Sequence, residues 1–332
     1  MTAADQPEPV DPKRARRRQI KRLVRWVVTI AVVGIVGYFF ATSLAGNWDE
    51  VVAKGVTFDW RWILATLFLV AAVPLTGLCW RRIVLVLDPA ATVGLLEAVS
   101  VQCLSWVLKY VPGQVGSVAN KVIWAQRRGI SRTLVLISFI YENVFLLLAS
   151  FVPAVAILLI ALGPELFGEN AVTLLLPLIA LIPLVLVAWR PFFHRLIAIP
   201  ARRLLKQDVP ASYFLSTGQT LRSIVEFVGP RILNAVGFVV LAASITDVAP
   251  EQWLVFGAAY VLGAAVGILA IFVPSGLGVR EAVIVLILSQ YIPTTDAIII
   301  SLVSRLLFTI GDVAIAGIYF LTRRTTPKEL SA

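Results

Sequence analysis

Apolar runs of about twenty residues recur along this chain, and the stretches 171–189 and 252–272 carry no charge for almost their whole length. As a helix, each run is long enough to cross a hydrocarbon layer of about 30 Å. The runs are continuously apolar and do not alternate with polar residues, which argues against an outer-membrane β-barrel. We therefore expect an all-α fold, a polytopic transmembrane helical bundle.

Composition excludes several other classes of protein. Hydrophobic residues make up 59% of the chain and charged residues only 14%, whereas soluble domains carry about 25% charged residues. The net charge of +10 would suggest nucleic acid in a soluble protein, but membrane proteins collect Lys and Arg in cytoplasmic loops. We expect no nucleic-acid partner. Cys79, Cys103 and the single His194 are scattered, so neither a metal site nor a cofactor is predicted.

The two ends of the chain are basic. Residues 1–22 form a basic tail, and the apolar run that follows, Leu23 to Leu44, exceeds the roughly 7–15 residues of the apolar region within a signal peptide. We interpret it as an uncleaved first span. A transmembrane domain over 23–322 and a second short basic tail over 323–332 follow, and both tails are expected in the cytoplasm of a multi-pass plasma-membrane protein.

Loop charges predict the topology. The acidic loops Gly163–Asn170, Thr246–Gln252 and Tyr291–Asp296 belong outside, and the Arg-rich segments belong inside. This arrangement gives about eight spans, the seventh of them too short to cross alone: 23–45, 62–80, 131–162, 171–189, 230–246, 252–272, 279–292 and 296–322.

Two further segments do not fit this count. The segment 92–129 has an apolar first half and a polar second half, so we expect a re-entrant helix that turns back at Pro112-Gly113. The amphipathic stretch Ser212–Val228 either lies at the cytoplasmic interface or begins the next span.

A Pro/Gly motif occurs twice, as Tyr110-Val-Pro-Gly-Gln-Val-Gly116 and as Phe272-Val-Pro-Ser-Gly-Leu-Gly278. Proline removes a helical hydrogen bond and glycine permits conformations closed to other residues, so each copy is expected to break a helix. The topology approaches the two copies from opposite sides, which is typical of an inverted repeat around a transporter's binding site. The predicted hinge residues are Pro112, Gly113, Gly116, Pro274, Gly276 and Gly278.

Charged and amide side chains gather near these breaks, although such groups are costly within a membrane. An arginine at the start of a helix can bind a phosphate, and Arg280 has that position. The alternative for each residue is a structural ion pair, such as Arg280 with Glu281 or Glu142 with Arg305. As a set, we expect the following residues to line a polar substrate-binding cavity: Lys109, Asn120, Lys121, Glu142, Asn143, Arg280, Glu281, Arg305 and Asp312.

The segments Lys109–Gly116, Val273–Glu281 and Ser304–Leu307 resemble the transmembrane region of lysylphosphatidylglycerol synthases and of related stand-alone flippase-like membrane proteins. Glu142 is also similar to a glutamate of that family. The resemblance covers roughly residues 23–322 and implies a plasma-membrane helical bundle that moves a lipid or lipid-linked headgroup between leaflets. The synthases carry aminoacyl transfer in a separate soluble domain, which this sequence does not contain, so synthase activity is not expected.

The leading hypothesis is therefore a flippase-like lipid transporter and not an enzyme. Its cargo would be an anionic lipid, or a glycosylated or polyprenyl-linked one. No P-loop motif is present, so ATP does not drive it directly. One alternative is a non-transporting membrane partner of a glycosyltransferase or lipid synthase. Another is an integral-membrane lipid transferase, which the lack of an Asp-rich motif disfavours. The sequence does not indicate an oligomeric state.

Overall fold

The computed structural model describes residues 58–110, 115–162, 189, 191–192, 210–269 and 278–323. All regular structure within these ranges is helical. Five helices are long and apolar enough to cross a membrane: α3 (Arg61–Leu87), α6 (Arg132–Leu162), α9 (Thr217–Ile245), α10 (Trp253–Leu269, preceded by the 3₁₀ turn Pro250–Gln252) and α12 (Thr294–Thr322). The predicted all-α membrane bundle is confirmed. The predicted span 23–45 and nearly all of 171–189 lie outside the described residues.

The remaining helices are too short to span. Helices α4 (Leu95–Val107) and α5 (Val115–Arg127) have 13 residues each, and α11 (Val279–Leu288) has 10. At 1.5 Å per residue they reach only about 20 Å and 15 Å. Helix α4 continues into a 3₁₀ turn (Leu108–Tyr110) and packs against α5, so the segment 92–129 turns back on itself as predicted. Helix α11 packs in the same way against α10.

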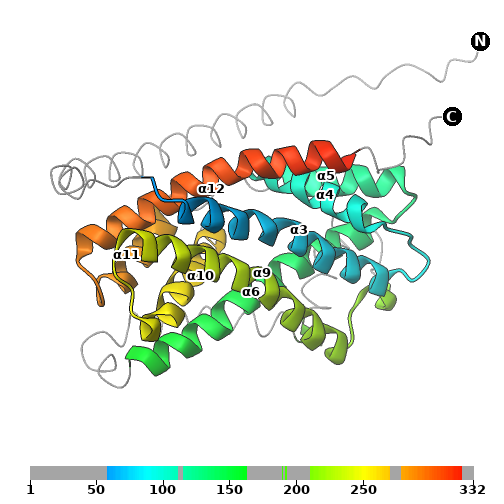
Figure 1. Ribbon diagram of the computed structural model, residues 1–332. Helices are drawn as coiled ribbons and strands as arrows, with labels where there is room; N and C mark the ends of the chain where they lie inside the picture. The colour runs from blue at the N-terminus through cyan, green and yellow to red at the C-terminus, as the bar shows by residue number, and fades with distance from the viewer. Residues whose placement is uncertain are drawn as a thin grey trace, which may run out of the picture.

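The eight described α-helices form two units with the same layout. Each unit is a long helix, a two-helix hairpin and a second long helix: α3, α4–α5 and α6, then α9, α10–α11 and α12. The packing stays the same when the units are exchanged, because α4 contacts α12 as α10 contacts α6, and α3 contacts α12 as α6 contacts α9. In Figure 1, α3 and α12 run in one direction and α6 and α9 in the other. The second unit is therefore inverted relative to the first.

Helices α3 and α9 form the main contact between the units, and they pack antiparallel. At one end, Trp62 Nε1 donates to Ser244 Oγ over 2.8 Å. At the other, Arg82 forms an ion pair with Glu226. Between them Gly237 allows close approach, since a Cβ there would lie 2.9 Å from the carbonyl oxygen of Ala65. The two units are thus joined along the whole length of both helices.

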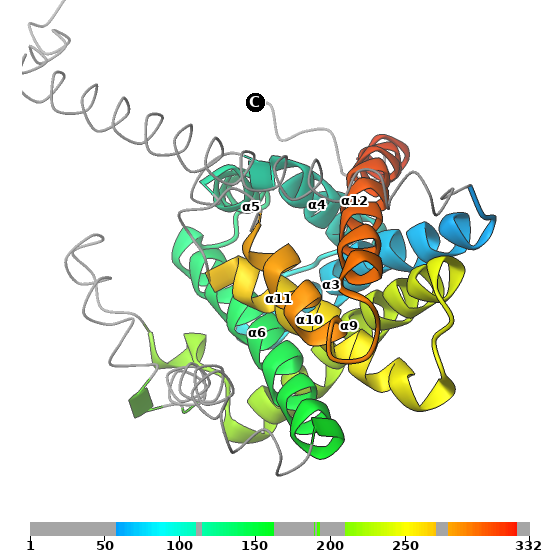
Figure 2. The same cartoon turned by 90° about the vertical axis from the view of Figure 1, so that its left-hand side faces the viewer.

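Helix α10 lies at the centre of the bundle. Figure 2 shows α10 and α11 enclosed by α6, α9, α12 and the α4–α5 hairpin. Most residues of α10 are buried, from Val255 to Gly267. By contrast, Ile63, Ile232 and Val313 are exposed on the outer faces of α3, α9 and α12. The face of a spanning helix that exposes large apolar side chains is the face that contacts lipid.

The largest differences from the predicted helix boundaries are at the end of α3 and the start of α9. Helix α3 was expected to end at residue 80, before the charges of Arg81 and Arg82, but it continues to Leu87. Arg81 Nε donates to the carbonyl oxygen of Val93 over 2.6 Å and Arg82 pairs with Glu226, so both charges are satisfied without ending the helix.

Helix α9 begins at Thr217, so the stretch Ser212–Val228 mostly begins this span and is not a separate interfacial helix. Ser216 caps its first turn together with Gln219, and Pro230 lies within the helix without ending it.

Candidate functional site

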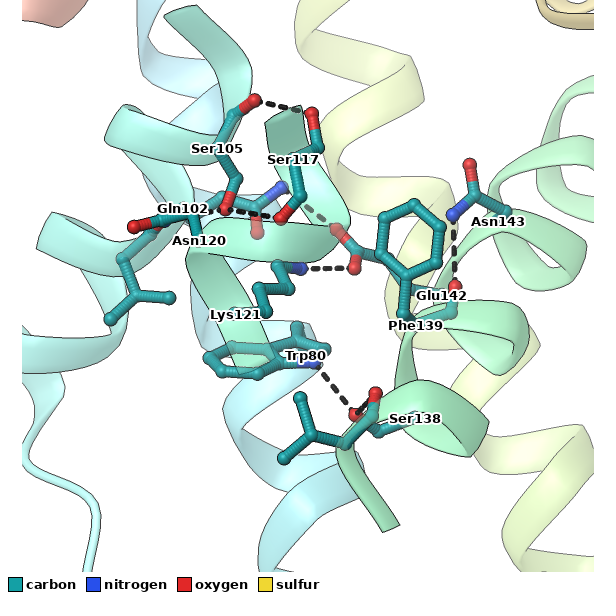
Figure 3. Close-up of polar contacts among 12 residues, drawn as sticks. Trp80, Gln102, Ser105, Ser117, Asn120, Lys121, Ser138, Phe139, Glu142 and Asn143 are labelled. Atoms are coloured by element: carbon teal, nitrogen blue, oxygen red, sulfur yellow. Dashed lines mark hydrogen bonds and ion pairs between the residues drawn. The ribbon is translucent and has the colours of Figure 1, made fainter. Parts of the chain in front are cut away.

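A buried ion pair joins the α4–α5 hairpin to α6. Lys121 of α5 pairs with Glu142 of α6, and their side chains are only 1% and 4% exposed. Gln102 Nε2 donates to Glu142 Oε1 over 2.8 Å, and the Lys121 ammonium lies 4.3 Å from the centre of the Trp80 ring. Figure 3 shows these groups converging between the α4–α5 hairpin and α6. Two charges this deeply buried persist only as partners of each other.

Hydrogen bonds fasten the two arms of this hairpin. Ser117 Oγ donates to the carbonyl oxygen of Ser105 over 2.6 Å. Asn120 Nδ2 donates to the carbonyl oxygen of Val101 over 3.0 Å and to Ser105 Oγ over 2.9 Å (Figure 3). Lipid offers no hydrogen bonds to these polar groups, so bonds within the hairpin satisfy them.

A second contact holds the open end of the hairpin. Glu97, in the first turn of α4, accepts hydrogen bonds from Arg128 Nε (2.6 Å), Trp124 Nε1 (2.8 Å) and the Gly94 amide (3.2 Å). Burial raises the pKa of the Glu97 carboxyl, but these donors outweigh it and hold the pKa below its ordinary value. Glu97 is thus a carboxylate at neutral pH.

The apex of the hairpin reaches into the second unit. Lys109 Nζ donates to Asp312 Oδ1 of α12 over 2.8 Å, and Trp106 Nε1 donates to the same oxygen over 2.7 Å. The Lys109 ammonium also lies 4.3 Å from the centre of the Phe308 ring. A cation this close to an aromatic face gains attraction from the ring's electrons.

Arg280, in the first turn of α11, also lies over the Phe308 ring. Its guanidinium is 4.8 Å from the Phe308 ring centre and 4.2 Å from that of Tyr260 on α10. The residue is 5% exposed. Among the described residues no carboxylate pairs with it, and its Nη2 has no hydrogen-bond partner.

Glu281 links the start of α11 to α12. Its Oε2 accepts a 2.6 Å hydrogen bond from the Gly278 amide, at a residue whose φ of +80° suits glycine. Its Oε1 lies 3.7 Å from Arg305 Nη1. Arg305 is therefore held beside the helix start where Arg280 sits.

Arg231 and Tyr260 complete this region, and neither is among the site residues that the sequence predicts. Arg231 is the middle residue of the 29-residue helix α9 and is 8% exposed. It lies within electrostatic reach of Tyr260 and Arg280. In the part of the chain that the structure describes, Arg231 Nε and the Tyr260 hydroxyl have no hydrogen-bond partner. The available signal was an arginine inside an apolar span, since a charge at mid-depth is costly.

We call these six charged residues the central cluster: Lys109, Arg231, Arg280, Glu281, Arg305 and Asp312. They come from four elements of both units, and Arg305 and Asp312 flank the midpoint of α12. Four are cations and two are carboxylates. The region between the two hairpins is therefore an electropositive site at mid-depth, suited to an anionic group.

The chain matches the family model of the lysylphosphatidylglycerol synthase TM region over residues 26–316. The chain belongs to this family. No curated protein matches it. This match confirms the suspected family relationship. The matched residues include all of the central cluster.

Within this lysylphosphatidylglycerol synthase TM region, the predicted site residues separate into two groups. Lys121, Glu142 and Asn120 lie together at the first hairpin. Lys109, Arg280, Glu281, Arg305 and Asp312 lie in the central cluster. Asn143 joins neither group by hydrogen bonding, because its Nδ2 donates to the carbonyl oxygen of Phe139 in its own helix over 2.8 Å (Figure 3).

The alternative ion pairs suggested by the sequence are wrong. Glu142 pairs with Lys121 and not with Arg305, and Glu281 pairs with Arg305 and not with its neighbour Arg280. Adjacent residues in a helix point in different directions, so Arg280 and Glu281 do not face each other.

The predicted hinges are only partly within the described residues. Gly116 lies in the first turn of α5, and Gly278 precedes α11. Pro112, Gly113, Pro274 and Gly276 lie outside. Over the described ranges, no group of three or more His, Cys, Asp or Glu side chains is arranged to hold a metal, and Cys79 and Cys103 are buried free thiols.

Proposed function

We propose that this protein is a flippase-like transporter that moves an anionic lipid headgroup through the central cluster, and that it is not an enzyme. The observation that carries the proposal is the buried excess of cations at mid-depth, between two hairpins of opposite orientation. Family membership and the inverted units support it, since transporters of this kind bind substrate where two inverted repeats meet.

In this proposal the headgroup lies among the cations Lys109, Arg280 and Arg305, while its tails stay in the surrounding lipid. Glu281 and Asp312 balance part of the charge and orient two of these cations. Lys121, Glu142 and Asn120 hold the first hairpin in this structure, and their contact with the headgroup stays a prediction.

We further propose a plasma-membrane location with both termini in the cytoplasm. Arg81 and Arg82 lie in the last two turns of α3, and Arg323 follows α12. These two helices end on the same side of the bundle (Figure 1). Asp247 and Glu251 follow α9, and Asp296 lies in the first turn of α12, so all three lie at the opposite end. By the positive-inside rule, the arginine-rich end faces the cytoplasm. Labelling of single cysteines at Arg323 and Asp247 in intact cells tests this orientation.

Lipid movement is tested with the purified protein in phosphatidylcholine vesicles that contain acyl-labelled fluorescent phosphatidic acid or phosphatidylglycerol. Dithionite quenches only the outer leaflet, so a transporter raises the quenched fraction above one half. We expect Arg280→Gln to abolish this gain. Arg222→Gln is the matched control, because Arg222 has a side chain 68% exposed on α9.

If the wild-type protein inserts correctly and moves none of these lipids, the transporter proposal is wrong. A partner subunit of a lipid or glycan enzyme then becomes the better interpretation, and copurification from its native membrane would identify that enzyme.

A further inference from the structure

Two of the four cations of the central cluster have no ion-pair partner among the described residues. Lys109 pairs with Asp312 at 2.8 Å and Arg305 lies 3.7 Å from Glu281, so these four residues sum to zero. Arg231 and Arg280 have no carboxylate partner anywhere in the described ranges, although both are more than nine-tenths buried. An isolated buried charge is expensive, and two of like sign near each other are more so.

Unused hydrogen-bond donors lie at the same place. Arg231 Nε, Arg280 Nη2 and the Tyr260 hydroxyl are shut off from solvent, and within the described ranges none of them meets a partner at hydrogen-bond geometry. They belong to α9, α10 and α11, and Arg280 is fixed between the rings of Tyr260 and Phe308. Guanidinium donors in fixed orientation match phosphate oxygens well.

From this balance we infer that Arg231, Arg280 and Tyr260 form a binding site for a doubly charged phosphate headgroup, the terminal phosphate monoester or diphosphate of a lipid. The inference rests on the proposed function and names its substrate class. A phosphodiester headgroup carries one negative charge and would leave one buried guanidinium uncompensated. A headgroup with an added ammonium would raise the positive excess.

Each of the three residues then has a distinct role. The two guanidiniums neutralise the dianion, and the Tyr260 hydroxyl donates to a third phosphate oxygen. Stacking on Tyr260 and Phe308 keeps Arg280 oriented before the headgroup arrives, so less conformational freedom is lost on binding.

Binding is measured by native mass spectrometry at pH 8, with the full-length protein in detergent. The added ligands are phosphatidic acid, phosphatidylglycerol of the same chains, and inorganic phosphate. We expect phosphatidic acid to bind about tenfold more tightly than phosphatidylglycerol, which is the scale of one charge-assisted contact. Arg231→Gln and Arg280→Gln should each abolish this preference, and Tyr260→Phe should reduce it about threefold.

Two controls separate binding from folding. Arg231→Lys keeps the charge and should keep most of the preference, while Arg222→Gln should leave it unchanged. Equal binding of the two lipids, or a preference that survives Arg231→Gln in folded protein, overturns the inference. Inorganic phosphate that binds as tightly as phosphatidic acid overturns its lipid part.

The vesicle assay distinguishes the two proposals. A protein that binds phosphatidic acid selectively but moves no lipid would retain this site and lose its proposed function. A protein that moves both lipids equally, with the same dependence on Arg280, would retain the function and lose the selective site.

Discussion

Lys109 and Arg280 share one aromatic ring although they come from different halves of the chain. Their charged groups lie 4.3 Å and 4.8 Å from the centre of Phe308. Phe308 is thus a common support for the apex of the first hairpin and the start of α11.

Replacing Phe308 by Leu should therefore destabilise the protein more than its lost volume suggests. Each cation–aromatic contact contributes about 0.5–2 kcal/mol, and two are lost together. Phe320→Leu is the control, because Phe320 is 55% exposed and has one cation, Arg323, 4.7 Å from its ring. Thermal unfolding in detergent, followed by tryptophan fluorescence, measures the difference. Equal melting shifts in the two variants would contradict a shared support.

The Lys121–Glu142 pair predicts strong non-additivity. Lys121→Met leaves a buried carboxylate alone, and Glu142→Gln leaves a buried ammonium alone, so each should cost about 3–5 kcal/mol of unfolding free energy. The double variant removes both charges and keeps an amide facing Gln102, so it should cost much less than the sum. Denaturant titration of all four proteins measures this coupling; additive costs would show that the two charges do not depend on each other.

Two glycines of α9 predict opposite outcomes for the same substitution. A Cβ at Gly237 would lie 2.9 Å from the carbonyl oxygen of Ala65, which is backbone and cannot rotate away. Gly237→Ala should therefore separate α3 from α9 and cost about 1–3 kcal/mol. At Gly229 the nearest atom is a methyl of Leu75 at 3.5 Å, so Gly229→Ala should be neutral or slightly stabilising. Melting temperatures in one detergent compare them directly.

The lowered pKa of Glu97 predicts a dependence of stability on acid. A carboxyl with a pKa lower in the folded than in the unfolded protein stabilises the fold above the unfolded value, about 4.3. That contribution is lost as the pH falls through the folded pKa. Glu97→Gln should be less stable than wild type at pH 7, by about 1–3 kcal/mol. The gap should narrow below about pH 4. A gap that does not change between pH 7 and pH 3 would contradict the assignment.

Hydrophobic runs predicted the long helices well, because length and apolar content alone define a span. Helix α6 differs by one residue at its start from the expected 131–162. Boundaries failed where charges found distant partners: Arg82 reaches Glu226, 144 residues away, so α3 continues past it. Chain-local reasoning cannot identify such partners.

The sequence likewise predicted part of the candidate site and not the rest. Proximity to the Pro/Gly motifs was enough to select Lys109, Arg280 and Glu281. It could not reveal that Lys109 meets Asp312 across 203 residues, or that Arg231 joins them from α9. The two motif copies predicted that the units are inverted. The contacts between the units also depend on which helix faces pack together, which neither motif encodes.

The two hairpins are alike in layout and unlike in chemistry. The first is closed by hydrogen bonds at Ser105, Ser117 and Asn120. The second is closed by close packing, with a Cβ at Gly263 only 2.9 Å from the Arg280 carbonyl oxygen, and by the Arg280 guanidinium against the Tyr260 ring. Hydrogen bonds must break before the first pair of arms can part, whereas the second pair must give up apolar packing and one cation–aromatic contact. The symmetry of the fold therefore does not extend to its energetics, and conformers related by exchanging the two hairpins would be unequally populated at rest.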